Sequence, residues 1–204
     1  MPANSTPNPV LARLGFPADA RLVIFHLDDV GMCHGSNRAY LELHEAGIVK
    51  TGSLMAPCPW SHEMISICQQ RPDLDLGVHL TLNAEWANYR WGPLSTRDWE
   101  SGLIDETGSF WPLTDIVAAN LNVPAAVAEM RAQVAMVDDA GIEFTHIDAH
   151  MLTAMLPELL PHYIELGFEY RVPVLAVRGF DEGSRTFNLA GMDAEEELAQ
   201  LRVQ

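Results

Sequence analysis

Carboxylate and imidazole side chains recur at the ends of three apolar segments of this chain. The segment VIFHLDDVGMCH, residues 23–34, runs from apolar residues directly into two adjacent aspartates. The segment GVHLTL contains a histidine, and THIDAH contains the pattern His-x-Asp-x-His. The residues concerned are Asp28, Asp29, His79, His146, Asp148 and His150. Carboxylates and neutral imidazoles together are the usual N and O ligands of a divalent metal ion, so this set predicts a metal site.

Strand geometry decides which of these side chains can meet. Side chains alternate along a strand, so His146, Asp148 and His150 share one face if the strand runs through all three. Asp28 and Asp29 point to opposite faces in an ideal strand, but both can reach one pocket where the chain turns at a strand end. His26 precedes Asp28 by two residues and can face the same pocket, although nothing in the sequence requires it.

Each motif alone has an ordinary structural explanation. An Asp pair after a strand commonly forms a turn or caps a helix. A single histidine such as His79 is more often a hydrogen-bonded core residue than a ligand. The three motifs favour a metal site only in combination, because catalytic groups of α/β proteins gather at the C-terminal ends of parallel strands.

Strand and helix patterns alternate along the chain and supply the required strand ends. We expect strands at residues 21–27, 48–56, 74–82, 142–150 and 170–179. We expect helices at residues 37–47, 61–70, 123–141, 157–167 and 193–204. Ser36 or Asn37 is expected to cap the first helix, and Pro157 to open the fourth.

This alternation predicts parallel strands with helical crossovers, either a doubly wound sheet or an α/β barrel. Residues 1–20 are expected to form a loose lead-in to a single α/β catalytic domain, residues 21–204. Five strands are too few for a complete barrel, so either the sheet is open or the domain is truncated at its C-terminus. The long insertion at residues 83–122 shows little periodicity, and a stretch of that length is usually functional.

The composition excludes several classes of partner. With 28 acidic against 12 basic residues the formal charge is −16, which argues against nucleic acid and anionic membrane surfaces. No apolar stretch approaches a membrane span, and the N-terminus has no signal-peptide pattern. The three cysteines form no CxxC motif and are expected to be reduced thiols, so we expect a cytoplasmic protein.

The order of these motifs resembles the YdjC-like carbohydrate deacetylases, the group that contains chitooligosaccharide and hopanoid-pathway deacetylases. The matching segments are DDVGMCHGSNRAYLELHEAGIVKTGSLMAP (28–57), LGVHLTL (76–82), DETGSFWP (105–112) and THIDAH (145–150). The first segment is long and specific, whereas His-x-Asp-x-His alone is a weak signal.

The resemblance implies a deformed or incomplete (β/α) barrel of mostly parallel strands, similar to polysaccharide deacetylases. It implies one divalent metal ion held by Asp29, His79 and His150, with Asp28 as the general base. The family is usually described with Mg²⁺, but two imidazoles and a carboxylate suit Zn²⁺ at least as well, so both ions stay open.

Two departures from the family pattern concern the substrate side of the site. Met151 and Leu152 stand where family members commonly carry further histidines. The chain also ends before the later His-Pro pair that is taken as the general acid, so the acid is unassigned.

The resulting hypothesis is a metal-dependent hydrolase that removes N-acetyl groups from amino sugars or glycan-bearing small molecules, with Asp148 orienting an imidazole. The tryptophans of the insertion either form a sugar-facing rim or anchor the insertion; these are Trp86, Trp91, Trp99 and Trp111. The alternatives are another divalent-metal hydrolase such as a phosphoesterase, and a non-catalytic sugar-binding protein on the same fold. The acetylated substrate and homo-oligomer formation are left open by the sequence.

Overall fold

The strands of this computed structural model run parallel in one sheet, and the structure describes residues 9–17 and 19–175. The strand order is β1-β2-β3-β4, the same as the order along the chain. The strands are β1 (His26–Val30), β2 (Thr51–Leu54), β3 (Asp75–Leu80) and β4 (Ile147–Ala149). A doubly wound sheet reverses its strand order at a switch point, whereas a barrel does not. The described part is therefore an incomplete (β/α) barrel, and the predicted fold class is confirmed.

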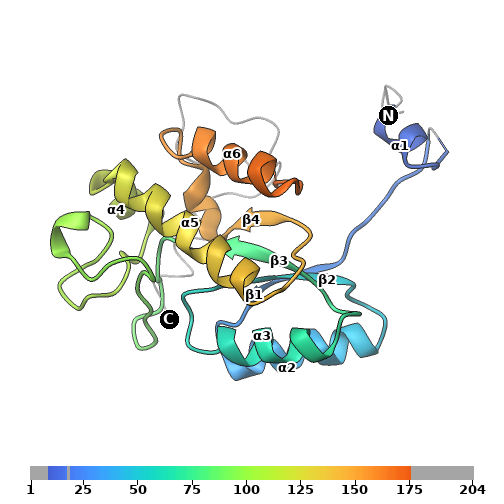
Figure 1. Cartoon of the computed structure of the whole chain (residues 1–204), viewed down its shortest axis with the longest axis horizontal. Coiled ribbons are helices and arrows are strands. Elements are labelled where there is room, and N and C mark those ends of the chain that lie inside the picture. Colours follow the sequence, from blue (N-terminus) through green and yellow to red (C-terminus); the bar gives the residue numbers. More distant parts are fainter. Residues whose placement is uncertain (1–8, 18, 176–204) are drawn as a thin grey trace, which may run out of the picture.

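Most helices lie against the sheet, whereas the first helix precedes β1 and lies apart from the sheet (Figure 1). The helices are α1 (Pro9–Arg13), α2 (His34–Glu45), α3 (Ser61–Gln70), α4 (Thr114–Ala119), α5 (Val123–Asp139) and α6 (Leu160–Tyr170), with 3-10 helices η1 (Trp99–Ser101) and η2 (His150–Met155). Helix α2 packs on β1, and α5 packs on β3 and α6. The packed faces of α3 and α5 bury Met64, Met130 and Val134 completely, so they form the hydrophobic core with the strands.

Side chains from the two outer strands meet across the sheet. In a flat sheet, β1 and β4 would be separated by three strand spacings, roughly 14 Å. Nevertheless, Nε2 of His26 on β1 lies 3.0 Å from Nε2 of His146, which directly precedes β4. Oδ1 of Asp29 lies 3.0 Å from Nδ1 of His150, which directly follows β4. The sheet therefore curls as a barrel wall does, and its inner face carries polar side chains.

The first strand differs from its prediction. Residues 21–27 were expected to be buried on both faces, but β1 begins at His26, and the preceding apolar residues are 48–78% exposed; these are Leu22, Val23, Ile24 and Phe25. Among the described residues, β1 is an edge strand that pairs only with β2, so no further strand is present to bury the run that precedes it.

Two helix starts also differ from their predictions. Cys33, rather than Ser36 or Asn37, is the N-cap of α2, because the Cys33 side chain and the Ser36 hydroxyl each accept the backbone N–H of the other residue. Helix α6 begins at Leu160, not Pro157. Leu156 has ψ 142°, the extended conformation favoured before proline, and this delays the helix.

Strand β4 is shorter than the predicted 142–150, because the chain enters η2 at His150. The backbone of Thr145 and His146 still bonds to Leu76 and Val78, so the ladder with β3 extends beyond the strand. Val174 forms an isolated parallel bridge with Ile147, where the fifth strand was expected. Residues 176–179 of that strand and the predicted helix 193–204 lie outside the described residues.

The insertion at residues 83–122 is built from η1, α4 and an antiparallel bridge between Ile104 and Phe110. The buried Phe110 anchors this bridge in the hydrophobic core. Within the described part of the chain, no helix has the length and apolar character needed to cross a membrane.

The turn after His150 contains two successive residues in the left-handed backbone region, Met151 at φ 50° and Leu152 at φ 57°. L-residues other than glycine pay roughly 1–2 kcal/mol in that region. We predict that Met151→Gly is more stable than Met151→Ala by about 1 kcal/mol, because both changes remove the half-exposed side chain and only glycine relieves the backbone. Urea unfolding of the two variants measures the difference. An alanine variant as stable as the glycine variant would show that this turn is not strained.

Candidate metal centre

Asp29 is placed by an irregularity in β1. Pairing with β2 runs from Leu27 opposite Gly52 to Val30 opposite Leu54, so β1 holds one extra residue in this interval. Such a bulge re-aims a side chain, and Asp29 adopts the left-handed region at φ 55°, which aspartate tolerates better than most residues. In a regular strand Asp28 would share the inner face with His26, and the bulge brings Asp29 to that face instead.

The chain after Asp29 is held by Asn37. The buried Asn37 side chain accepts the Gly31 backbone N–H at 2.7 Å and donates to the Trp60 carbonyl and to Glu63. Gly31 is at φ +87°, and a Cβ there would lie 2.7 Å from Leu54 Cδ1, so a larger residue does not fit. This network fixes the turn that presents Asp29 to the inner face of the sheet.

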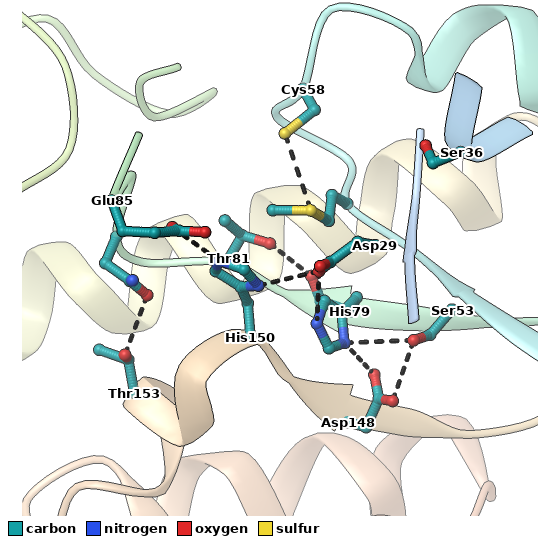
Figure 2. Close-up of polar contacts among 12 residues, drawn as sticks. Asp29, Ser36, Ser53, Cys58, His79, Thr81, Glu85, Asp148, His150 and Thr153 are labelled. Atoms are coloured by element: carbon teal, nitrogen blue, oxygen red, sulfur yellow. Dashed lines mark hydrogen bonds and ion pairs between the residues drawn. The ribbon is translucent and has the colours of Figure 1, made fainter. Parts of the chain in front are cut away.

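The Asp29 carboxylate lies between two buried imidazoles (Figure 2). Its Oδ1 is 3.3 Å from Nε2 of His79 and 3.0 Å from Nδ1 of His150. The two ring centroids are 5.4 Å apart. The structure thus brings together the three residues that the resemblance implied as ligands, from the end of β1, the end of β3 and the start of η2.

Each imidazole has a second carboxylate on its other nitrogen. Nδ1 of His79 lies 2.7 Å from Oδ1 of Asp148, whose Oδ2 accepts the Ser53 hydroxyl at 2.9 Å. Nε2 of His150 lies 3.0 Å from Oε2 of Glu85. Figure 2 shows both carboxylates on the sides of the rings that face away from Asp29. Metal-binding histidines characteristically bond such a carboxylate, which fixes the tautomer and the ring orientation.

Glu85 is a site residue that the sequence analysis missed. It lies in the insertion, outside the strand that ends at Leu80, so strand periodicity gives no information about its direction. The only available signal is its position shortly after GVHLTL.

Charge pairing perturbs the titration of the central groups. Burial alone would raise the pKa of Asp29, but hydrogen bonds from His150 and His79 outweigh it and hold that pKa well below its ordinary value. Burial likewise lowers the pKa of His79, but bonds to Asp148 and Asp29 outweigh it and raise the pKa to about 9. A protonated His79 offsets part of the negative charge of Asp29 and Asp148, which is the electrostatic role that a bound cation would take over.

The donor set fits a divalent ion. One ligand atom from each of Asp29, His79 and His150 lies within 4.8 Å of the other two. Two imidazoles and one carboxylate are the protein ligands of many catalytic sites with one open coordination position. The buried Cys58 thiol is close enough to the Asp29 and Glu85 carboxylates for their charges to add to the effect of burial, and its pKa is raised, so it stays protonated and is a poor ligand.

The other sequence-predicted residues, Asp28, His146 and Asp148, lie in three different environments. Asp28 is exposed, and none of the hydrogen bonds or ion pairs among the described residues involves its side chain. Asp148 contacts His79, as expected for an orienting carboxylate. His146 does not join the Asp29 group and instead faces His26.

The insertion tryptophans divide into a pair that packs into the protein and a pair that is exposed. Trp91 is buried, donates to the Asn83 carbonyl and packs edge-on against His150 at a centroid distance of 6.1 Å. Trp111 is partly buried and donates to the Gly102 carbonyl. Trp86 and Trp99 are 52% and 56% exposed. The buried pair anchors the insertion, and the exposed pair is free to contact a ligand.

The fold and the site together define a parallel barrel-type protein with a candidate metal centre at the strand ends. Residues 22–202 match the family described as YdjC-like protein, so this chain belongs to that family. The resemblance seen in the sequence is thereby confirmed.

Relatives in several bacteria are similar to this chain across most of its length. It is 33% identical over 165 residues to a carbohydrate deacetylase of Thermus thermophilus, covering 80% of this chain and 56% of the relative. It is 32% identical over 153 residues to a carbohydrate deacetylase of Vibrio cholerae, covering 74% and 57%. The chain therefore spans less than three fifths of the length of these curated relatives.

A solved structure shares the fold. A protein of Enterococcus faecalis assigned to cellobiose-phosphate cleavage superposes with a TM-score of 0.68 at 27% identity. The superposition covers 77% of this chain and 59% of that protein.

The Glu85–His150 contact predicts a measurable effect on metal affinity. Glu85→Gln keeps the shape but removes the charge, and we expect the affinity of the Asp29 site for Zn²⁺ to fall roughly 10–100-fold. Isothermal titration calorimetry measures this affinity. The control is Glu165→Gln, which alters an exposed Glu–His contact on α6, 3.6 Å from Nδ1 of His162. Equal affinities for both variants would remove Glu85 from the site.

Proposed function

We propose that this protein hydrolyses N-acetyl groups of amino sugars or of glycan-bearing small molecules. The observation that carries the proposal is the Asp29 carboxylate held between the His79 and His150 imidazoles at the strand ends. Membership of the YdjC-like family and the carbohydrate deacetylases among its relatives support this substrate class. The E. faecalis neighbour is also assigned to a carbohydrate substrate.

Asp29, His79 and His150 would hold one divalent ion, for which the two imidazoles favour Zn²⁺ over Mg²⁺. A bound ion of this kind lowers the pKa of water and polarises an amide carbonyl. Asp148 and Glu85 orient the two rings through the nitrogens that face away from Asp29. The ligands therefore need little rearrangement when the ion binds.

Asp28 is the proposed general base. It directly precedes Asp29 in β1. Its exposed carboxylate is free to accept a proton, because it forms no hydrogen bond or ion pair with another described side chain. It would take the proton of the water that attacks the acetyl carbon. The C–N bond then breaks, and acetate and the free amine leave.

Trp86 is the proposed sugar-contacting residue. It follows Glu85, whose carboxylate contacts His150, and half of its surface is exposed. An indole offers a flat apolar face on which a pyranose ring can stack beside the reacting group.

Many phosphoesterases hold two metal ions about 3.5–4 Å apart. Such a pair would need ligands that reach both ions. The described residues contain one other His/Asp group, formed by His26, His146 and Asp148. The His79 ring lies between this group and Asp29, because it contacts Asp148 through one nitrogen and Asp29 through the other. A whole imidazole thus separates the two groups. This arrangement favours hydrolysis at a mononuclear centre over the phosphoesterase alternative.

The general-base role of Asp28 predicts a selective loss of turnover. In Asp28→Asn, kcat for acetate release from N-acetylated chitooligosaccharides should fall by about 10²–10⁴-fold, the range for general base catalysis. Zn²⁺ affinity should stay unchanged, because Asp28 is not a ligand. The control is Asp115→Asn, an exposed carboxylate on α4, which should keep full activity. Full activity of Asp28→Asn would assign the base elsewhere, and an inactive wild type on a panel of N-acetyl sugars would refute deacetylation.

The position of Trp86 predicts an effect on substrate binding. Trp86→Ala should raise KM for an N-acetylated disaccharide roughly 2- to 10-fold with little change in kcat, as expected from the loss of one ring contact. Trp99→Ala is the matched control, because Trp99 is similarly exposed but packs against Trp111. Steady-state kinetics compare the two variants. If both change KM equally, Trp86 has no special place at the site.

A further inference from the structure

A second group of metal-ligating side chains lies on the inner face of the sheet, separate from Asp29. It consists of His26 on β1, His146 before β4 and Asp148 on β4. One ligand atom from each lies within 4.8 Å of the other two. Neither the proposed ligand set nor the proposed catalytic base includes His26 or His146.

We propose that His26, His146 and Asp148 form a second site for a divalent cation of the Zn²⁺ type. Nε2 of His26 is 3.0 Å from Nε2 of His146 and 3.7 Å from Oδ2 of Asp148. Four ligands around Zn²⁺ at about 2.0–2.1 Å stand roughly 3.3 Å apart in tetrahedral geometry. The observed separations bracket this value, so small side-chain movements would complete three of the four positions.

Hydrogen bonding determines which nitrogen of His146 is available to bind a metal ion. The Thr145 hydroxyl has one proton, and it donates that proton to the Asp75 carboxylate. The 2.9 Å contact between Thr145 Oγ1 and His146 Nδ1 must therefore be donated by the imidazole. Nδ1 of His146 carries the hydrogen, so the lone pair of this ring is on Nε2, which faces His26 and Asp148.

Gly77 makes room for this arrangement. A Cβ at Gly77 would overlap the His146 ring at Nε2, so the imidazole crosses β3 where a side chain would otherwise stand. A strand glycine often marks such a close approach. The ring could not reach His26 over any larger residue at position 77.

Thr51 supplies a second polar group on the same face. It is in register with His26 on the adjacent strand, and residues in register in a parallel pair point to the same side. Its buried hydroxyl is without a hydrogen-bond partner among the described residues. A cation with a coordinated water would offer that hydroxyl a partner. His26 keeps 25% of its side-chain surface exposed, which leaves access for an ion.

Asp148 links the second site to the first. Its Oδ1 bonds to His79 and its Oδ2 faces His26, so one carboxylate would orient a ligand of the first ion and coordinate the second. The variants that test the proposal therefore leave Asp148 intact.

The test is the number of ions bound per chain, which does not depend on activity. The probes are Zn²⁺ by equilibrium dialysis and Co²⁺ by its visible absorption, each added to metal-free protein. We expect two ions for the wild type, one for His26→Ala, one for His150→Ala, and none for the double variant at micromolar ion concentrations. His62→Ala, an exposed histidine on α3, is the control and should bind two.

The affinity of the second site should fall in His26→Ala by more than the roughly 10–100-fold loss typical of an outer-shell change. Gly77→Ala should have a similar effect by displacing His146, and far-UV circular dichroism confirms that each variant is folded. A His150→Ala variant that binds no ion, or a His26→Ala variant that binds as many ions as the wild type, would overturn the proposal. The His26–His146 contact would then be only a hydrogen bond between the two rings.

Discussion

The Asp29 carboxylate is the interaction on which the rest of the structure depends. It joins β1 to β3 through His79 and to η2 through His150, so one side chain connects strands on both sides of the curled sheet. Two buried imidazoles and a partly buried carboxylate would be costly without partners, and here each has at least one. The bulge at Asp28–Asp29 makes this possible, because in a regular strand Asp28, rather than Asp29, would share the inner face with His26.

The polar residues of the inner face form layers along the sheet. Asp29, His79 and His150 form one layer, Asp148 and Ser53 bond to each other beneath it, and His26 and His146 form the next. Small side chains are part of this order, because Gly77 and Ser53, in register on adjacent strands, leave space above the sheet for imidazoles. Small residues at these positions are therefore as necessary for the site as the ligands themselves.

Much of this arrangement could be predicted from the sequence. Strand ends of a parallel sheet meet at one edge, which was enough to group the Asp pair, His79 and the His-x-Asp-x-His motif. The family resemblance then singled out Asp29, His79 and His150 among them. Helix α3 matches its prediction because its apolar spacing and the Pro72 that follows it are local signals. The Cys33 cap of α2 was missed because a thiol is an uncommon cap, and the Leu22–Phe25 run was predicted to be buried because the pattern does not show which strand lies at an edge.

Other features depend on contacts that spacing does not encode. Glu85 reaches His150 from an insertion whose path no periodicity defines. His146 and Asp148 share a strand face as predicted, yet His146 turns toward His26 because Gly77 leaves the way open. These positions follow from tertiary packing, which residue types and spacing alone do not fix.

The central claim is that Asp29, His79 and His150 bind one cation together. Anomalous diffraction from crystals soaked in Zn²⁺, recorded on both sides of the zinc absorption edge, locates the ion directly. The account predicts a peak about 2.0–2.2 Å from one ligand atom of each of the three residues. Zinc found only elsewhere, or bonded to fewer than two of these three side chains, would contradict it.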